Sequence, residues 1–196
     1  MSAAVTLALL FFLSVALNEQ VTEGCRCVQR HPQQQFCSSD VVIRAKVTGE
    51  ANSTRPGLTA YNIQTIKTFK PLHKKGIQVI YTSQSSCGIN LKNGEYLLSG
   101  HDDSGRVVVD LCDRVERWDR VSSVQKQYLS MYQRGCVCEI SPCTGASCLI
   151  KMRQKKCLMR VNDSSSLDEA ALRSICLRDR DGFCSWKKIL DNYKSS

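Results

Sequence analysis

The chain has 196 residues, with 27 Lys and Arg against 18 Asp and Glu, which gives a formal net charge of +9 at pH 7. All twelve cysteines follow residue 24. A dense, even set of cysteines after an export signal is typical of a disulfide framework in an oxidising compartment. Export and cystine bridges argue against the nucleic-acid partner that positive charge would otherwise suggest.

Residues 1–24 are interpreted as a cleaved signal peptide. The apolar run from Val5 to Leu17 is too short to span a bilayer and is followed by polar residues. The small-residue rule allows cleavage before Cys25 or before Leu17, and we favour the site before Cys25. Cys25 then becomes the first residue of a secreted protein of the extracellular space or matrix, with no membrane span.

A short helix and a strand are expected next. Residues 31–37 suit a helix because Pro32 fits its first turn, where a missing N–H costs nothing. In residues 40–47, apolar side chains alternate with Arg44 and Lys46, which predicts a half-buried strand. Residues 52–57 form a turn, and the motif that begins at Asn52 is a candidate glycosylation site.

Four more strands are predicted at residues 58–69, 77–82, 95–99 and 106–111, separated by turn motifs. In the first of these, the inward-facing phase changes from Tyr61 and Ile63 to Ile66 and Thr68, which predicts a β-bulge. Five such strands in succession predict a mainly β fold built on a small five-stranded OB-type barrel. A β-sandwich is the alternative.

A helix begins after Ser122, with Ser122 and Gln125 expected as its capping box. Its apolar face is expected to pack on the core. This face carries Val124, Tyr128, Met131 and Tyr132.

Seven of the twelve cysteines lie beyond residue 134, where so short a segment buries too little apolar surface to be stable without cross-links. We therefore expect an N-terminal domain at 25–137 and a small disulfide-rich subdomain at 138–196. The subdomain is predicted to contain one helix at 167–177, capped by Ser166 and Glu169, and a polar tail at 187–196. Asn162 is a second glycosylation candidate.

Motifs of common enzymes are absent from the sequence, including His-Glu-x-x-His, Gly-x-Ser-x-Gly and the phosphate-binding glycine loop. The three histidines, His31, His73 and His101, lie in polar segments and are expected at the surface. Cysteines two residues apart are poorly placed to bridge each other, so each Cys-x-Cys cysteine should reach a distant partner. The spacing alone does not choose among the pairings. We expect neither an enzyme nor a cofactor of its own.

The net charge rises by two when Glu19 and Glu23 leave with the signal peptide. Outside the cell, positive charge favours sulfated glycans or acidic protein surfaces. Basic clusters at 73–75 and 151–156 are interpreted first as solvated surface.

Several motifs resemble those of the tissue inhibitors of metalloproteinases. They include Cys-Arg-Cys at 25–27, His-Pro-Gln-Gln-Gln-Phe-Cys at 31–37, Asp-Val-Val-Ile-Arg-Ala-Lys at 40–46, Gly-Cys-Val-Cys at 135–138 and Asp-Gly-Phe-Cys-Ser-Trp at 181–186. The resemblance covers essentially the whole mature chain and all twelve cysteines. Within the family, the pattern looks closest to the type 2 member.

The resemblance implies an N-terminal netrin-like OB barrel with flanking helices and a small disulfide-rich C-terminal subdomain. It also implies six disulfides. These are Cys25–Cys87, Cys27–Cys112, Cys37–Cys136, Cys138–Cys184, Cys143–Cys148 and Cys157–Cys176.

The function that the resemblance implies is inhibition of matrix metalloproteinases by a monomer in a one-to-one complex. The α-amino group and carbonyl oxygen of Cys25 would chelate the catalytic zinc of the protease. Arg26 departs from the small hydroxyl residue that is usual in the family. The expected protease-binding residues are Cys25, Arg26, Cys27, Val28, Gln29, Ser85, Ser86 and Cys87. The alternative is a non-inhibitory netrin-like module that binds extracellular matrix or sulfated glycans.

Overall fold

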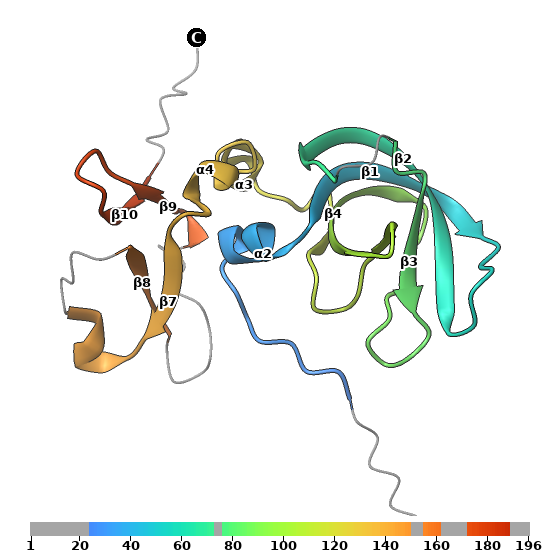
Figure 1. The fold of residues 1–196 in the computed structure, drawn as a ribbon, viewed down its shortest axis with the longest axis horizontal. Helices are drawn as coiled ribbons and strands as arrows, with labels where there is room; N and C mark the ends of the chain where they lie inside the picture. Colours follow the sequence, from blue (N-terminus) through green and yellow to red (C-terminus); the bar gives the residue numbers. More distant parts are fainter. Residues whose placement is uncertain (1–23, 73–75, 150–154, 162–171, 189–196) are drawn as a thin grey trace, which may run out of the picture.

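The computed structural model describes residues 24–72, 76–149, 155–161 and 172–188. A β-barrel and a group of short C-terminal strands lie at opposite ends of the molecule, with three short helices between them (Figure 1). Among these described residues, no helix is long and apolar enough to cross a membrane. The predicted signal peptide lies outside the described residues, apart from Gly24.

The barrel is closed by five strands. They are β1 (Val41–Ala51), β2 (Leu58–Lys70), β3 (Val79–Ser83), β4 (Gly94–Asp103) and β5 (Arg106–Val108). The order β1-β2-β3-β5-β4 returns to β1, because β4 also pairs with β1. Closure leaves no open edge between these strands, which supports the predicted OB-type barrel and excludes the sandwich. A short sixth strand, β6 (Val115–Arg117), pairs with β4 and was not predicted.

Alternation of apolar and polar side chains builds the barrel core. On β1, Ile43, Ala45 and Val47 are almost completely buried, and they pack with Tyr61 and Leu98 from β2 and β4. Because successive side chains of a strand point to opposite faces, these residues line the interior while their neighbours face outward. The same alternation is what made these strands predictable.

The predicted irregularity of β2 is present, but its side-chain assignment was wrong. The β1–β2 register shifts three times and leaves Ile66 and Phe69 of β2, and Thr48 of β1, without a partner. An extra residue of this kind bends a strand, as barrel closure requires. Ile66 is 45% exposed and Thr68 is exposed too, because the bulged end of β2 lies outside the core.

Helix α2 (Pro32–Ser38) begins where the sequence predicted it. His31 is its N-cap: the ring Nδ1 accepts a hydrogen bond from Gln33 N, and Gln34 Oε1 accepts one from His31 N. His31 is completely buried, 5.1 Å from the ring of Trp186. The prediction of a surface position for His31 was therefore wrong, since capping satisfies the imidazole inside the protein. His101 is exposed, and His73 lies outside the described residues.

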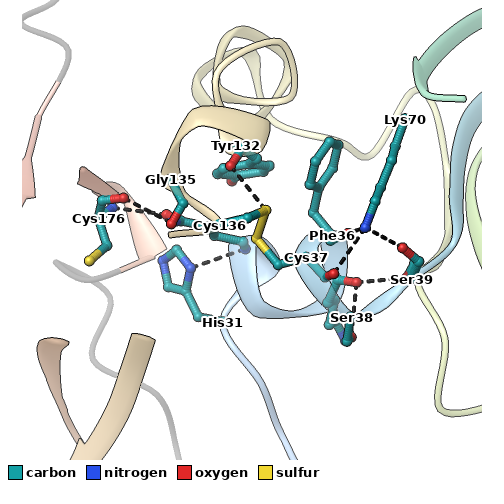
Figure 2. The surroundings of a disulfide bond; sticks show 12 residues. His31, Phe36, Cys37, Ser38, Ser39, Lys70, Tyr132, Gly135, Cys136 and Cys176 are labelled. Carbon is teal, nitrogen blue, oxygen red and sulfur yellow. Dashed lines mark hydrogen bonds between the residues drawn. A yellow bond between two sulfur atoms is a disulfide. The ribbon is translucent and has the colours of Figure 1, made fainter. Parts of the chain in front are cut away.

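The C-terminal end of α2 is fixed from two sides (Figure 2). A disulfide joins Cys37 to Cys136. The Lys70 ammonium donates to the carbonyl oxygens of Phe36, Cys37 and Ser39. A cation at a helix C-terminus satisfies carbonyls that have no intrahelical partner.

The helix predicted after Ser122 is divided into α3 (Ser123–Tyr128) and α4 (Tyr132–Gly135). Ser122 caps α3 by accepting from Gln125 N, as expected. The Gln125 side chain does not complete a capping box, because its Oε1 accepts from Arg114 Nη2 instead. The predicted apolar face does pack on a core with Phe36 and Leu97.

The C-terminal part contains two pairs of short strands. They are β7 (Glu139–Cys143) with β8 (Lys156–Arg160), and β9 (Ile175–Arg178) with β10 (Cys184–Lys187); the 3-10 turn η1 (Gly145–Leu149) follows β7. The helix predicted at 167–177 was wrong at its end, because residues 175–177 belong to β9. Ser166, Glu169 and Asn162 lie outside the described residues, as does the tail from 189 onward.

Gln33 joins the C-terminal strands to the helices. Its Nε2 donates to Gly135 O at 2.9 Å and to Cys176 O at 2.8 Å, and its Oε1 accepts from Cys176 N at 2.9 Å. The side chain is 1% exposed, so each of its polar atoms is satisfied inside the protein. The boundary between residues 137 and 138 stays a prediction.

Candidate functional site

The segment that precedes α2 is fixed to the end of the barrel by two disulfides. Cys25 is bonded to Cys87, with their Cα atoms 5.0 Å apart, and Cys27 is bonded to Cys112, with their Cα atoms 5.1 Å apart. The barrel partners lie after β3 and after β5, two strands that pair side by side. Residues 25–29 and 85–87 therefore form one continuous surface, which we call the N-terminal edge.

The loop that carries Cys87 is held by its own hydrogen bonds. Ser83 Oγ lies 2.7 Å from Ser85 Oγ and accepts from Ser85 N, and Ser85 Oγ accepts from Cys87 N. Gly88 N donates to Ser85 O. Small hydroxyl side chains stabilise such turns because they reach neighbouring backbone groups. Ser85 therefore shapes the loop besides lying at the surface.

Gly88 is needed because the loop turns back on itself. A Cβ built on Gly88 would lie 1.7 Å from Ser83 O, a distance at which no side chain fits. Glycine thus allows the backbone on both sides of Cys87 to approach closely.

Asp110 connects this loop to the turn that carries Cys112. Its Oδ1 accepts hydrogen bonds from Ser83 N at 3.2 Å and from Thr82 Oγ1 at 3.4 Å. Asp110 N donates to Asp113 Oδ2 at 3.0 Å, and burial raises the pKa of the Asp113 carboxyl. Both disulfide anchors of the N-terminal edge are therefore part of one hydrogen-bonded unit.

Most of the predicted protease-binding residues reach solvent. Arg26, Cys27, Gln29, Ser85 and Ser86 are exposed, and Cys25 and Cys87 are partly exposed. Val28 is 77% exposed, so the N-terminal edge presents this apolar side chain to solvent. The glycosylation candidate Asn52 is also exposed, in the turn after β1.

Leu111 belongs to this surface but was missed by the sequence analysis. It is 49% exposed, and its N–H donates to Cys87 O at 2.8 Å. The signal in the sequence was its position immediately before Cys112, in the residues assigned to an ordinary strand. The strand β5 ends at Val108, so Leu111 lies in a turn.

A cavity of about 320 Å³ lies behind the N-terminal edge. Its lining includes Arg26, Val28, Arg30, His101, Asp110 and Asp113.

Within the part of the chain that the structure describes, two groups of three cysteine sulfurs lie close enough together to hold a metal ion: Cys25, Cys27 and Cys112, and Cys138, Cys176 and Cys184. Every one of these sulfurs is in a disulfide. A cysteine binds a metal through its thiolate, which a disulfide sulfur does not offer, so these groups are cross-links. That the chain has no cofactor of its own stays a prediction.

The sequence profile described as tissue inhibitor of metalloproteinase matches residues 23–186. The chain belongs to this family. The match begins beside Cys25 and ends at Trp186, so it includes the N-terminal edge, the barrel and the C-terminal strands.

Curated relatives agree over nearly the whole length. Metalloproteinase inhibitor 3 of Scyliorhinus torazame is 34% identical over 195 residues, which cover 94% of this chain and 91% of the relative. Metalloproteinase inhibitor 2 of Homo sapiens is 36% identical over 203 residues, with 94% and 91% covered. Metalloproteinase inhibitor 4 of Mus musculus is 36% identical, with 84% and 80% covered. The identities to types 2, 3 and 4 are similar, so the comparisons do not support the closer resemblance to the type 2 member.

The cysteines of this family member form six disulfides in the structure, the same six pairs that the resemblance implied. Three lie in the predicted N-terminal domain and three in the predicted C-terminal subdomain. The N-terminal three fix both ends of the segment before the barrel: two hold the N-terminal edge, and the third holds α2.

Proposed function

We propose that the chain is a secreted inhibitor of matrix metalloproteinases that chelates the catalytic zinc of its target with the α-amino nitrogen and carbonyl oxygen of Cys25. The observation that carries the proposal is the disulfide between Cys25 and Cys87, which fixes this residue at an exposed edge of a rigid barrel. Family membership and the names of the relatives support the same activity.

The chemistry follows from the coordination of catalytic zinc. Three protein ligands hold the ion and leave one position for water, and the ion can expand to five ligands. The nitrogen and oxygen of one residue are separated by two carbon atoms and can close a five-membered chelate ring. Displacing the water removes the nucleophile of the protease. An α-amino group has a pKa of about 8, so its neutral form is accessible at neutral pH. Coordination to zinc releases the proton.

Chelation requires a free amine on Cys25, and therefore cleavage directly after Gly24. An uncleaved signal peptide, or cleavage before Leu17, leaves a peptide bond where the amine is needed. An amide nitrogen is a poor zinc ligand at neutral pH. The mature N-terminus is thus as important to the function as the fold.

Rigidity contributes to affinity because the N-terminal edge is ordered before it binds. The loop closed by Cys25 and Cys87 spans 62 residues. Side chains and loops that become ordered only on binding each reduce affinity. Here the two disulfides and the Asp110 hydrogen bonds order the N-terminal edge during folding, so little ordering is left for binding.

The residues beside Cys25 are placed to contact the substrate cleft on either side of the zinc. Val28 and Gln29 continue the chain in one direction, and Ser85 and Ser86 lie on the other side, next to Cys87. Arg26 follows the chelating residue directly. Burying an unpaired guanidinium in an apolar pocket costs several kcal/mol, so Arg26 favours proteases whose pocket is deep, hydrated or acidic.

The experiment is a titration of a matrix metalloproteinase catalytic domain with the purified protein, followed with a peptide substrate. The intact mass gives the mature N-terminus in the same preparation. We expect stoichiometric one-to-one inhibition by protein that begins at Cys25. Absence of inhibition by that species contradicts the proposal.

Binding of sulfated glycans is the second candidate, and one surface favours it. The Arg44 guanidinium lies 4.6 Å and the Lys126 ammonium 4.9 Å from the ring centre of Trp118, on the outside of the barrel. Trp118 also stacks on Phe69 at 6.2 Å. The Arg44 guanidinium is already paired with Glu95, so Lys126 is the cation beside this ring that suits a sulfate group on a sugar. Salt-dependent retention on immobilised heparin, reduced by Lys126→Ala, would support this activity.

A further inference from the structure

Arg26, Val28 and Arg30 form a stripe that runs along the N-terminal edge and one residue beyond it. The segment before α2 is an extended stretch (Figure 1), and successive side chains of an extended chain point to opposite sides. The three alternate residues line the cavity of about 320 Å³, whereas Gln29 does not. All three are also exposed. The stripe therefore lies on one side of the segment, at the rim of the cavity, where another protein can reach it.

The backbone is fixed at both ends of the stripe. Arg26 lies between two cysteines that are bonded to the barrel. Arg30 precedes His31, which is completely buried and whose N–H donates to Gln34 Oε1 at 2.9 Å. The two guanidinium groups are therefore carried on anchored positions, although the side chains themselves reach solvent.

The two arginines of the stripe have no carboxylate partner among the residues that the structure describes. Arg44, Arg114 and Arg117 elsewhere in the barrel each form an ion pair with a glutamate or an aspartate. No such pair involves Arg26 or Arg30. A guanidinium stays protonated in proteins and offers five N–H donors in a planar fork. Both groups therefore keep their full charge and their donors for a bound protein.

The carboxylates that line the same cavity have other contacts. Asp110 Oδ1 accepts hydrogen bonds from Ser83 N and Thr82 Oγ1. Asp113 Oδ1 lies 3.2 Å from His101 Nε2, and the Asp113 side chain is only 11% exposed. These two groups face the barrel, so the charge that the rim presents to solvent is positive.

We propose that the stripe selects metalloproteinases whose cleft carries carboxylates on both sides of an apolar contact, and that Arg30 binds the outer carboxylate. This inference rests on the proposed inhibitory function and names the class of target. Four residues of extended chain span about 13 Å. The two carboxylates of the target are therefore about that far apart, with the surface that Val28 contacts between them.

Arg30 is expected to act mainly on the rate of association. Val28 and Gln29 occupy the cleft in the proposed complex, so Arg30 lies at its outer end, where water remains. An ion pair in contact with water adds little to the equilibrium affinity because the solvent screens it. Complementary charges around an interface nevertheless raise the association rate constant, and salt weakens this effect.

The test measures the association and dissociation rate constants of the mature protein with two metalloproteinase catalytic domains. One domain carries carboxylates at the outer end of its cleft, and the other carries lysines or arginines there. Arg30→Glu reverses the charge of the stripe, and Arg30→Gln removes it. Arg160→Glu is the matched control, because Arg160 is exposed on β8, among the C-terminal strands at the other end of the molecule (Figure 1). Denaturant unfolding establishes that each variant is folded.

With the acidic cleft at low ionic strength, we expect association about tenfold slower for Arg30→Glu and about threefold slower for Arg30→Gln than for the wild type. The dissociation rate constants should change less than the association rate constants. In about 1 M salt, where charges are screened beyond about 3 Å, the differences should nearly disappear. With the basic cleft, Arg30→Glu should associate at least as fast as the wild type. Arg160→Glu should follow the wild type throughout.

Equal slowing by Arg30→Glu and Arg160→Glu would mean that only the net charge matters, and would overturn the inference. Equal slowing of Arg30→Glu with the two catalytic domains, or slowing that persists in high salt, would overturn it too. In each of these cases the wild type still inhibits, so the proposed function is unaffected. If wild-type protein that begins at Cys25 binds neither domain, the proposed function fails and the inference fails with it.

Discussion

Cys25 and Cys87 are 62 residues apart in the chain, yet their Cα atoms lie 5.0 Å apart across a disulfide. This bond places the first residue of the expected mature chain beside a loop from the middle of the barrel. Ser83, Ser85 and Asp110 fix that loop by hydrogen bonds. The N-terminal edge is thus part of the folded barrel, and a change in the loop is expected to affect inhibition.

Removal of this disulfide tests the relationship directly. In the chain-entropy description, a bridge that closes 62 residues stabilises the protein by about 4 kcal/mol. The double variant Cys25→Ser, Cys87→Ser should lose about this much unfolding free energy in denaturant titration. Its inhibition constant should rise at least a hundredfold, which corresponds to about 2.8 kcal/mol of binding free energy.

The matched control removes Cys143–Cys148, which closes only 5 residues in the C-terminal strands. We expect a loss of about 2 kcal/mol there, with inhibition of a catalytic domain unchanged. Equal losses of inhibition in the two double variants would show that cross-linking in general matters, and not the position of Cys25.

Gly88→Ala should displace the loop that carries Cys87. The new Cβ would lie 1.7 Å from Ser83 O, so the backbone must move, at a cost of about 3 kcal/mol in unfolding free energy. Inhibition should weaken in parallel, measured against the same protease.

Gly182→Ala is the control for Gly88→Ala, since Gly182 has φ +85° and its Cβ would come no closer than 3.5 Å to another atom. Its expected cost is about 1 kcal/mol from backbone strain, without an effect on inhibition. A Gly88→Ala protein with wild-type inhibition would mean that the loop geometry is not needed.

Arg26→Thr should broaden the range of proteases that are inhibited. The variant removes a guanidinium that must lose water when it enters an apolar pocket. Inhibition constants over a panel of matrix metalloproteinases should fall most, by about tenfold or more, for enzymes with shallow apolar pockets. Arg26→Lys serves as the comparison, because it keeps the charge. An unchanged profile for Arg26→Thr would remove Arg26 from the determinants of selectivity.

Gln33→Ala should destabilise the junction between the helices and the C-terminal strands. It leaves two carbonyl oxygens and one N–H without their buried partner, with an expected loss of about 3 kcal/mol in unfolding free energy. Gln35 lies on the same helix and is only partly buried, so Gln35→Ala should cost less than about 1 kcal/mol. Similar losses for both variants would contradict the role given to Gln33.

The strands of the barrel could be predicted because each depends on a pattern of neighbouring residues. Alternating side chains in β1 and turn motifs between strands specify each element separately. Their number and order also fit a sandwich, and the pairing of β4 with β1 decides for the closed barrel. The burial of His31 could not be predicted in this way, since Trp186, the ring that packs on it, is far away in the sequence. The end of the predicted helix at 167–177 failed for a related reason: Ile175 and Cys176 are buried against residues of other elements, and tertiary packing overrides the local pattern.

Only some residues of the N-terminal edge could be predicted from the sequence, for the same reason. Motifs placed Cys25 and Cys87 in it, but Leu111 joins it only through a backbone hydrogen bond to Cys87 O. No spacing rule links positions 87 and 111. Likewise, His101 on β4 lies 3.2 Å from Asp113 in the turn after β5, a contact that sequence periodicity does not specify.

The central claim is that the free α-amino group of Cys25 binds the zinc of the target, and one measurement tests it most directly. Two forms of the protein are prepared with the same six disulfides, one beginning at Cys25 and one with a single alanine before it. Intact mass and denaturant unfolding establish that they differ only at this position. The inhibition constant of each is then measured against one matrix metalloproteinase catalytic domain. We expect the extended form to be weaker by about a thousandfold or more, equivalent to about 4 kcal/mol. Equal inhibition by the two forms would contradict the claim.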